Sequence, residues 1–392
     1  MKKRLNIAIV HDNITHHTDG GIISTLRFAH HLNKSGHKVI FISGKPKGKK
    51  EDIEYFKGIK TYRSFSILLP KTKNQFLIAF PSVKKLKKIF SEEKIDIVHT
   101  MIPTPSAFSA IKAAKSLGKK VVIHSHTQPE NIFLYLPEMM RTKKMNSLFY
   151  KFLIWAYEKG DKIICPSKFA EKLLKDNKSY LKTIVISNGV DLTKFNKLNK
   201  NNFIKKYKLS KKHKRILFVG RIDPDKSIDT LIKAMPIILS KFKNTEVDII
   251  GSGNLKVHME DLTEKMGLHN KIKFYGKVSD EDLVNAYNSA DIFVLPSLAE
   301  LEGMVVLEAM ACGKPLLIAN SKASASTYFV DGNGFLFNPK DPKDLAKKAL
   351  ILLKNEKLLK KMSKRSLEII KDYDINKSGS KLEEVYYSLL KK

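Results

Sequence analysis

Two cations flank a tight turn in the second half of the chain. The apolar run LFVG (217–220) is followed by Arg221, by Asp-Pro-Asp at 223–225, and by Lys226. If the run is a strand, two cations five residues apart around one turn at its carboxyl end can hold a diphosphate from two sides. Ser227 is placed to cap the helix that follows. A solvated turn is the alternative, but only 7 of the 72 basic residues are arginine, which gives Arg221 more weight.

A pair of carboxylates frames a glycine in the segment ELEGMVVLEAMACGKP (300–315). A helix that starts near Met304, just after Gly303, directs its first N–H groups toward a phosphate. Glu308 then lies about one turn into the helix and can accept hydrogen bonds from sugar hydroxyls, and Glu300 precedes it in a loop. The acid and base of a glycosidase are the alternative, but a plain glycosidase has no diphosphate for the two cations to neutralise.

The amino-terminal half offers two further candidates at predicted strand ends. The strand at 5–10 opens into a loop with Gly20-Gly21 before a helix, which allows a ligand to approach the backbone closely. The strand VVIHSH (121–126) ends in His124 and His126, which point to the same side of an extended chain. A zinc pair is conceivable there, but no third ligand stands nearby, so we expect no metal site.

The elements that must position these residues form a repeating strand–helix pattern. Short, nearly continuous apolar runs alternate with amphipathic stretches, which is typical of parallel strands covered on both faces. The runs are 5–10, 38–43, 96–100, 120–126, 162–165, 183–187, 215–220, 246–250, 271–275, 291–296, 314–319 and 334–337.

A polar, strand-free stretch at 191–214 separates these runs into two series. We therefore predict two doubly wound α/β domains facing a cleft, with ligands at the carboxyl ends of the strands. The predicted boundaries are 1–195 for the first domain and 196–375 for the second, followed by a last helix at 376–392.

Composition narrows the class of protein. The 392 residues are 43% hydrophobic and 28% charged, which is typical of a globular chain. The two cysteines match no disulfide framework, and no apolar run is long enough to span a membrane, so we expect a cytoplasmic protein. The net charge of +33 comes mainly from lysine. It reflects either lysine-rich usage or an anionic partner, and the scarcity of arginine argues against a nucleic-acid reader.

Residues 55–91 contain nine Lys or Arg and no Asp or Glu. Val83, Leu86, Ile89 and Phe90 fall on one helical face, and four lysines, Lys84, Lys85, Lys87 and Lys88, fall on the other. This pattern favours a basic amphipathic helix that lies on an anionic bilayer. The alternative is an ordinary helix whose apolar face packs on the sheet.

Five motifs in order along the chain resemble glycosyltransferase family 4, which has the GT-B fold. They are SNGVD (187–191), GRIDPDK (220–226), ADIFVLPS (290–297), ELEGMVVLEAMACGKP (300–315) and DGNGFLF (331–337). The resemblance implies a retaining transfer of sugar from a nucleotide-sugar, with no metal and no other cofactor. It also implies that residues 1–195 form the acceptor-side domain, that residues 196–375 bind the nucleotide-sugar, and that the helix at 376–392 returns to the first domain.

The resemblance also implies roles for individual residues. Arg221 and Lys226 would hold the donor diphosphate, and Gly21 would approach it from the other domain. Glu300 would bind the donor sugar, Glu308 would bind the ribose, and His126 would lie near the reacting carbon. The backbone at three positions would sit beside the sugar and the phosphate: Gly303, Met304 and Val305.

Two departures from the family pattern bear on specificity. Many members read Glu-Gly-Phe-Gly where this chain has Glu-Leu-Glu-Gly at 300–303, and Ser187 stands where proline is frequent. The run Ala-Glu-Leu at 299–301 is similar to a branch that glycosylates lipids such as diacylglycerol. We therefore predict a hexosyltransferase that uses a UDP-sugar such as UDP-glucose and a membrane lipid or glycan acceptor, bound peripherally to the inner face of the cell membrane. A polysaccharide or soluble sugar-phosphate acceptor, or a non-catalytic protein that binds polyanions or nucleic acid, are the alternatives.

Overall fold

The computed structural model describes residues 3–14, 20–49, 51–68, 77–130, 139, 141–178, 180–198 and 202–391. The chain divides into two compact units. The first unit comprises Met1–Pro129, Glu138–Gly189 and Ile375–Lys392, and the second comprises Glu130–Pro137 and Val190–Asp374. The last helix is therefore part of the first unit.

The first unit contains an eight-stranded sheet within its described residues, in the order β10-β9-β8-β7-β1-β2-β4-β3. Its strands are β1 (Asn6–Val10), β2 (Lys38–Gly44), β3 (Ile53–Phe56), β4 (Ile59–Ser64), β7 (Ile97–Thr100), β8 (Lys120–His124), β9 (Lys162–Cys165) and β10 (Thr183–Val185), with a separate hairpin of β5 (Ser66–Leu68) and β6 (Leu77–Ala79). Its helices are α1 (Gly20–Lys34), α2 (Val83–Glu92), α3 (Pro105–Ser116), α5 (Lys143–Tyr157), α6 (Lys168–Asn177) and α14 (Ile375–Leu390). Neighbouring strands are parallel except for the antiparallel pair β3 and β4.

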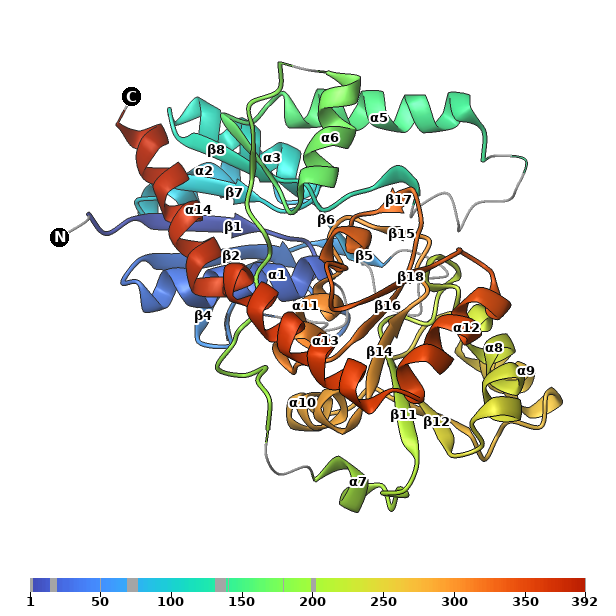
Figure 1. Cartoon of the computed structure of the whole chain (residues 1–392). Coiled ribbons are helices and arrows are strands. Elements are labelled where there is room, and N and C mark those ends of the chain that lie inside the picture. The colour runs from blue at the N-terminus through green and yellow to red at the C-terminus, as the bar shows by residue number, and fades with distance from the viewer. Residues whose placement is uncertain are drawn as a thin grey trace. The chain divides into compact units, whose positions relative to one another are not determined.

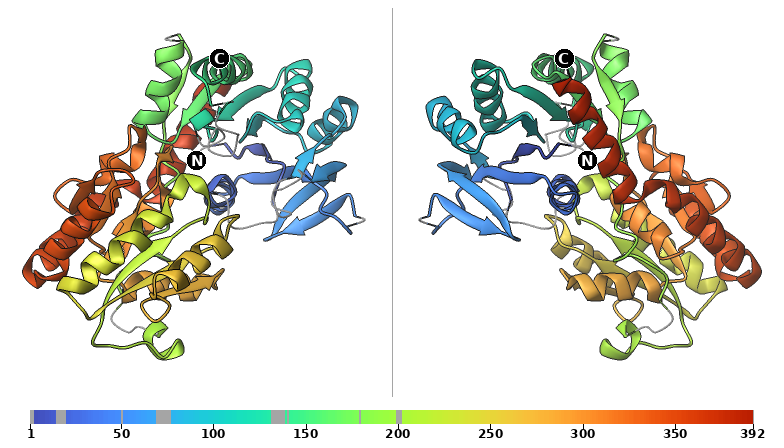
Figure 2. Two further views of the ribbon diagram at one scale, coloured as in Figure 1. Left: turned by 90° about the vertical axis from the view of Figure 1, so that its right-hand side faces the viewer. Right: turned by 90° about the vertical axis from the view of Figure 1, so that its left-hand side faces the viewer.

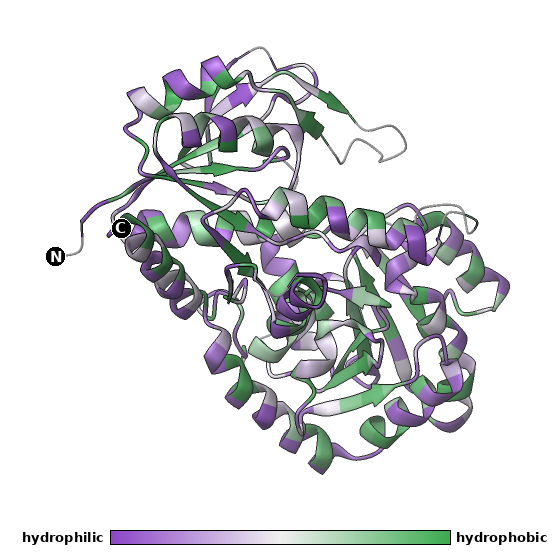
Figure 3. Ribbon diagram, turned by 90° about the horizontal axis from the view of Figure 1, so that it is seen from above, coloured by the Kyte–Doolittle hydropathy of each residue, from purple (hydrophilic) through white to green (hydrophobic). Residues whose placement is uncertain are grey.

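Helices cover both faces of this sheet (Figures 1 and 2). On one face, α1 and α14 lie against each other, as their blue and red ribbons show in Figure 1, and enclose a core with strand residues such as Ile7, Ile97 and Val122. On the other face, α2 contacts α3, and α5 contacts α6. Because successive side chains alternate between the two faces, both faces require apolar residues, and the strands are largely hydrophobic in Figure 3.

The second unit contains a six-stranded parallel sheet among its described residues, in the order β13-β12-β11-β14-β16-β18. Its strands are β11 (Lys214–Val219), β12 (Thr245–Ile250), β13 (Ile272–Gly276), β14 (Ile292–Leu295), β16 (Leu316–Ala319) and β18 (Gly334–Phe337), with a short parallel pair of β15 (Ala299–Glu300) and β17 (Ala323–Ser324). Its helices are α7 (Phe203–Lys206), η2 (Pro224–Lys226), α8 (Ile228–Lys241), α9 (Lys256–Lys265), α10 (Asp280–Ser289), α11 (Met304–Ala311), η3 (Ala325–Phe329), α12 (Pro342–Leu353), α13 (Glu356–Ile369) and η4 (Ile370–Tyr373).

Each sheet has a point where the strand order reverses. In the second unit the chain runs outward from β11 through β12 to β13 and then returns to β14, which pairs with the other side of β11. In the first unit the same reversal lies between β1 and β7. Doubly wound sheets bind ligands at the carboxyl ends of the strands at such points. All twelve predicted runs are strands, and the predicted doubly wound architecture is confirmed.

Candidate active site

The turn after β11 carries a cluster of ion pairs at the switch point of the second unit. Arg221 donates from Nη1 to Asp223 Oδ2 at 2.6 Å and from Nη2 to Asp225 Oδ2 at 3.2 Å. Lys226 Nζ lies 3.0 Å from Asp225 Oδ2 and donates to Glu300 Oε1 at 2.6 Å. The structure therefore brings together Arg221, Lys226 and Glu300, although 74 positions in the sequence separate Lys226 from Glu300.

Local backbone structure fixes this turn. Pro224 opens the short helix η2, and Leu298 N donates to Asp225 O at 2.8 Å, which ties the turn to the loop after β14. Ser227 stands at the N-cap position of α8, but its φ of 45° is left-handed and its side chain caps no backbone N–H. Ser227 Oγ instead pairs with Thr230 Oγ1 at 2.9 Å, so the predicted cap hydrogen bond is wrong.

The electrostatics of the cluster favour the ionised forms of Asp225 and Lys226. Burial raises the pKa of Asp225, but Lys226 and Arg221 outweigh it and leave that pKa below its usual value. Burial likewise lowers the pKa of Lys226, and the carboxylates of Asp225 and Glu300 more than offset it, so the net shift is upward. Three carboxylates, including Asp223, contact two cations here in the part of the chain that the structure describes. A diphosphate that enters must therefore displace these contacts.

A helix begins beside this cluster. Gly303 has a φ of +94°, and any Cβ at this position would collide with the Ser326 hydroxyl, so the turn into α11 requires glycine. Met304 and Val305 form the first residues of α11, as predicted, where backbone N–H groups lack intrahelical acceptors. The pairing of β15 with β17 places Glu300 opposite Ser324 and fixes the loop before the helix.

Glu308 lies one turn into α11 and is buried. Its Oε2 accepts a hydrogen bond of 2.9 Å from the hydroxyl of Tyr287, which comes from α10. Tyr287 Oη also contacts Val305 O at 3.3 Å. The sequence analysis missed Tyr287, because only the fold brings α10 and α11 to the same face of the sheet.

A second missed element is the loop Gly251-Ser252-Gly253 after β12. A Cβ at Gly251 would collide with Gly220 O, and one at Gly253 with Ile222 O. Ile222 N donates to Ser252 O at 3.0 Å, so the loops after β11 and β12 run in backbone contact. Two glycines directly after the apolar run at 246–250 were the available signal.

In the first unit, Gly21 is the second residue of α1, and its carbonyl accepts from Thr25 Oγ1 at 2.7 Å. Ser24 Oγ donates to Asn188 Oδ1 at 2.6 Å. Gly189 has a φ of +65° and would collide with Ile375 if it carried a Cβ. These contacts join the start of α1 and the start of α14 to the SNGVD motif, and they explain why Asn and Gly occur there.

His126 follows β8 and stands in a row of three histidines. Its ring stacks on that of His124 with centroids 4.2 Å apart, and the ring of His124 stacks on that of His99 at 5.5 Å. His124 and His126 thus point to the same side of the extended chain, as predicted. Burial lowers the pKa of His99 to about 3 and that of His124 well below its usual value, and His99 Nδ1 lies 2.7 Å from Tyr386 Oη. Among the described residues, no group of three His, Cys, Asp or Glu side chains could hold a metal ion.

Asp12 is a further group that the sequence analysis did not single out. It lies two residues after the end of β1 and is buried. Burial raises its pKa to about 6, although the Ser106 and Thr104 side chains act in the opposite direction. Its signal in the sequence was an acid two residues after the first apolar run.

The lysines predicted to contact a membrane lie on α2. Lys84 and Lys87 are exposed, Lys85 pairs with Asp52 at 3.1 Å, and Lys88 lies 3.8 Å from Glu92. The apolar face opposite them, Leu86, Ile89 and Phe90, is buried in the unit. That face cannot enter a bilayer while the unit is folded, and the ordinary packed helix is what the structure shows. In the described chain, moreover, no helix combines the length and apolarity that crossing a membrane requires.

Comparison with known protein families covers most of the chain. The family described as Glycosyltransferase Family 4 matches residues 18–194, and the family described as Glycosyl transferases group 1 matches residues 199–368.

Three relatives illustrate the range of matches. The uncharacterized glycosyltransferase MJ1607 of Methanocaldococcus jannaschii is 37% identical over 42% of this chain and 43% of its own length, so this match spans less than half of that protein. MJ1178 from the same organism, also an uncharacterized glycosyltransferase, is 29% identical over 86% of this chain and 91% of its own. Alpha-monoglucosyldiacylglycerol synthase of Streptococcus pneumoniae is 24% identical over 73% of this chain and 64% of its own.

Solved structures share the fold over almost the full length. Sucrose-phosphate synthase from Thermosynechococcus elongatus superimposes with a TM-score of 0.83 at 19% identity, covering 99% of each chain. Anabaena HepE, solved in complex with UDP and glucose, gives 0.77 at 17% identity and covers 98% of this chain and 100% of its own. Taken with the two family matches, these likenesses establish that the chain belongs to glycosyltransferase family 4 and is a glycosyltransferase of the GT-B fold.

Proposed function

We propose that the protein is a retaining glycosyltransferase that moves a sugar from a UDP-sugar to a membrane lipid. The observation that carries the donor half of this proposal is the cluster of Arg221, Lys226 and Glu300 beside the start of α11. It places two cations, a carboxylate and free helix N–H groups at one switch point, which are the groups that a diphosphate linked to a sugar requires.

On the donor side, Arg221 and Lys226 stabilise the charge that develops on the diphosphate as it leaves. The first N–H groups of α11 add to this, so the proposal assigns no metal to the reaction. Glu300 accepts hydrogen bonds from the donor sugar, and the buried Glu308 binds the ribose. Lys226 and Glu300 contact each other at 2.6 Å, so donor binding exchanges their mutual contact for one to phosphate and one to hydroxyl.

On the acceptor side, we assign roles to two residues of the first unit from family membership. Gly21 leaves the backbone at the start of α1 open to the donor diphosphate. His126 acts near the reacting carbon, and the buried rings of His124 and His99 behind it hold its orientation through stacking. The acceptor hydroxyl attacks from the face that the leaving group vacates, which gives retention.

The choice of donor and acceptor rests on relatives. HepE was solved with UDP and glucose, and the name of the Streptococcus pneumoniae relative is that of a diacylglycerol glycoside synthase. A lipid acceptor would require the protein to work at the surface of a membrane, and we propose peripheral binding there.

The test is a donor and acceptor panel. UDP-, GDP- and ADP-sugars are screened by thermal shift, because a bound donor raises the melting temperature by mass action. Active donors are then incubated with diacylglycerol vesicles in the presence of EDTA, and the anomer of the product is read by NMR. We expect a UDP-sugar to stabilise the protein and an α-linked glycolipid to form. Transfer only to soluble acceptors would contradict the lipid proposal.

His126→Ala tests the acceptor side separately. We expect donor affinity to stay unchanged while transfer is lost. Loss of donor binding and of stability together would show that His126 has only a structural role.

A further inference from the structure

Helix α5, at the top of Figure 1, carries apolar side chains on two opposite faces. One face is buried and includes Tyr150, Leu153, Ile154 and Tyr157. On the other face, Leu148, Phe152 and Trp155 are 60%, 43% and 50% exposed. Spacings of four and three residues place these three side chains in one stripe along the helix. This stripe is strongly apolar, yet it lies on the exposed side of α5 and is not part of the core.

The stripe continues onto the neighbouring helix α3. The ring of Phe108 lies 5.2 Å from that of Trp155 and 6.2 Å from that of Phe152, and the latter two lie 5.9 Å apart. Leu148, Phe152, Trp155 and Phe108 thus form one patch on the surface of the first unit, which we name the α3–α5 surface. Contiguous exposed apolar patches of this kind mark sites of interaction.

The charged residues within α3 and α5 are all positive, and the nearest acid, Glu158, directly follows α5 and pairs with Lys178 at 2.8 Å. Neither α3 nor α5 contains an acidic residue. Lys112 and Lys115 are exposed four and seven residues after Phe108, and so share its helical face. Lys144 and Lys151 are exposed beside the stripe, and Lys159 Nζ lies 3.9 Å from the centre of the Trp155 ring.

The two lysines at the start of α5 do not stabilise this helix. Lys143 and Lys144 occupy its first turn, where the helix dipole disfavours cations and no acidic residue compensates. A surface that is apolar at its centre, cationic at its rim and centred on a tryptophan matches the interface of an anionic bilayer, where acyl chains meet charged headgroups. A protein partner would need an apolar surface with an equally acidic rim.

We infer that the α3–α5 surface docks the protein on anionic lipid, with Phe152 and Trp155 inserted at the level of the headgroups. This inference deepens the proposed function and rests on it for the identity of the acceptor, but vesicle binding is measured without any transfer. It also replaces α2 as the membrane contact, because the apolar face of α2 is buried.

Trp155 makes the test direct, because it is the chain's single tryptophan. The full chain is titrated with vesicles of phosphatidylglycerol and phosphatidylcholine, and with pure phosphatidylcholine. We expect the emission of Trp155 to shift to the blue and to be quenched by brominated acyl chains only with the anionic vesicles, and less so at high salt. No change in emission with anionic vesicles at low salt would overturn the inference.

Two double variants locate the contact. Leu148→Ser with Phe152→Ser removes exposed side chains and should weaken vesicle binding about tenfold or more, since it removes most of the apolar area that inserts. The matched control, Lys84→Gln with Lys87→Gln on α2, should bind like the wild type. Should the apolar variant misfold, as circular dichroism would show, Lys144→Gln with Lys151→Gln replaces it and should weaken binding to anionic vesicles about thirtyfold, at roughly 1 kcal/mol for each lysine. Loss of binding in the α2 control alone would overturn the inference.

The remaining outcomes separate this inference from the proposed function. Lipid glycosylation that persists at the wild-type rate in both α5 variants would overturn the α3–α5 surface and leave the function intact. Vesicle binding through this surface without any glycolipid product would contradict the lipid acceptor instead. A wild type that sediments as a dimer and ignores vesicles, with α5 variants that are monomers, would assign the surface to a second copy of the chain and overturn lipid docking.

Discussion

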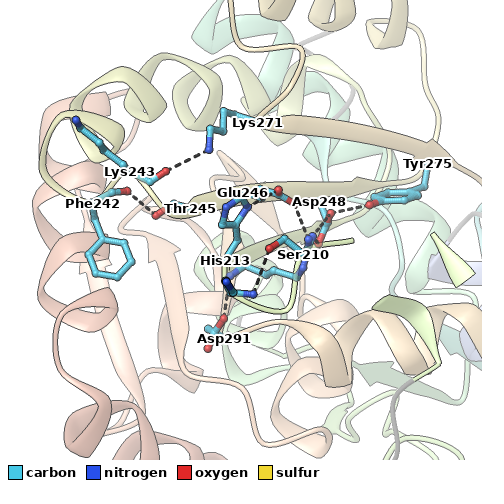
Figure 4. A network of polar contacts seen from close by, with 12 residues as sticks. Ser210, His213, Phe242, Lys243, Thr245, Glu246, Asp248, Lys271, Tyr275 and Asp291 are labelled. Carbon is cyan, nitrogen blue, oxygen red and sulfur yellow. Dashed lines mark hydrogen bonds and ion pairs between the residues drawn. The ribbon is translucent and has the colours of Figure 1, made fainter. Parts of the chain in front are cut away.

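The second unit holds two clusters of buried ion pairs at opposite ends of the same strands. Near the amino ends, Arg215 of β11 donates to Asp248 of β12 at 2.8 and 3.0 Å and also donates to Glu246 of the same strand. Figure 4 shows Glu246 and Asp248 with two further partners, His213 and Tyr275. Tyr275 donates to Asp248 Oδ1 at 2.8 Å, and His213 Nδ1 lies 2.6 Å from Glu246 Oε1. At the carboxyl ends lies the cluster of Arg221, described above.

The two clusters consist of the same residue types but have different surroundings in the fold. The amino-end cluster is built on strand positions in fixed register, with Arg215 opposite Glu246, and the Arg215 side chain is only 1% exposed. The carboxyl-end cluster is built on loops, and Arg221 is 24% exposed. Ion pairs between strands hold the sheet together, whereas ion pairs between loops can exchange partners when a ligand arrives. Position in the fold, rather than residue type, thus separates a structural cluster from a binding one.

The largest effect is expected at the amino end. Arg215→Ala leaves Asp248 and Glu246 buried without their cation, which should lower the free energy of unfolding by about 3–5 kcal/mol. Urea denaturation measures this loss. The activity of the fraction that remains folded should be unchanged, and a specific loss of donor binding would erase the distinction between the clusters.

Arg221→Ala and Lys226→Ala should show the opposite pattern. Each removes a donor to the leaving diphosphate and should cost about 2–4 kcal/mol of transition-state stabilisation, measured as kcat/KM. Lys233→Ala is a matched control, because Lys233 pairs with Asp229 at 2.8 Å on the exposed side of α8 and takes no part in the site. Wild-type turnover in the Arg221 and Lys226 double variant would remove the site assignment.

Glu300→Gln should separate sugar recognition from diphosphate binding. The amide keeps the shape but loses a charged acceptor, so turnover should fall by an amount equivalent to about 1.5–3 kcal/mol. Affinity for UDP should not fall, because Glu300 no longer competes for Lys226. Weaker UDP binding in this variant would show that the pair supports the diphosphate site rather than competing with it.

Asp12 is a buried acid beyond the carboxyl end of β1 in the first unit, and it can be compared with the two clusters of the second unit. Its pKa of about 6 in the folded protein lies above the ordinary value of 3.8 for an aspartate, so the native state binds the proton more tightly. Stability should therefore fall as pH rises from about 4 to 6, and the ionised form should cost about 1–3 kcal/mol above that window. Asp12→Asn should raise the free energy of unfolding at pH 8 and flatten this dependence. Equal slopes in the two proteins would exclude Asp12 as the titrating group.

Much of this architecture could be predicted because parallel strands buried on both faces are apolar throughout. β3 and β4 escaped that criterion, since they form the edge of the sheet and alternate in polarity, with Arg63 buried in β4. The residues of the turn after β11 were visible as motifs. Their pairing was not, because Lys226 meets Glu300 only when the loops after β11 and β14 come together.

The choice of the helix that contacts the membrane also depended on packing that the sequence does not show. α2 and α5 both combine lysines with apolar residues, and the sequence favoured α2 for its sharper segregation of the two kinds. The core takes the single apolar face of α2 and one of the two faces of α5. Because the core covers only one face of a helix, the second apolar face of α5 stays exposed. The presence of two apolar faces was the signal in the sequence for this surface.

The contact between Lys226 and Glu300 makes the site selective against fragments. A free phosphate that draws Lys226 away takes this cation from Glu300. A free sugar that engages Glu300 takes one of two carboxylates from Lys226, which keeps its contact with Asp225. Each such loss costs about 1–3 kcal/mol. A molecule that carries an anion and a hydroxyl can contact Lys226 and Glu300 at the same time. We therefore expect the pair to favour ligands that carry both groups over ligands that carry one. Free donor sugar should then tighten the binding of UDP, which calorimetry can measure.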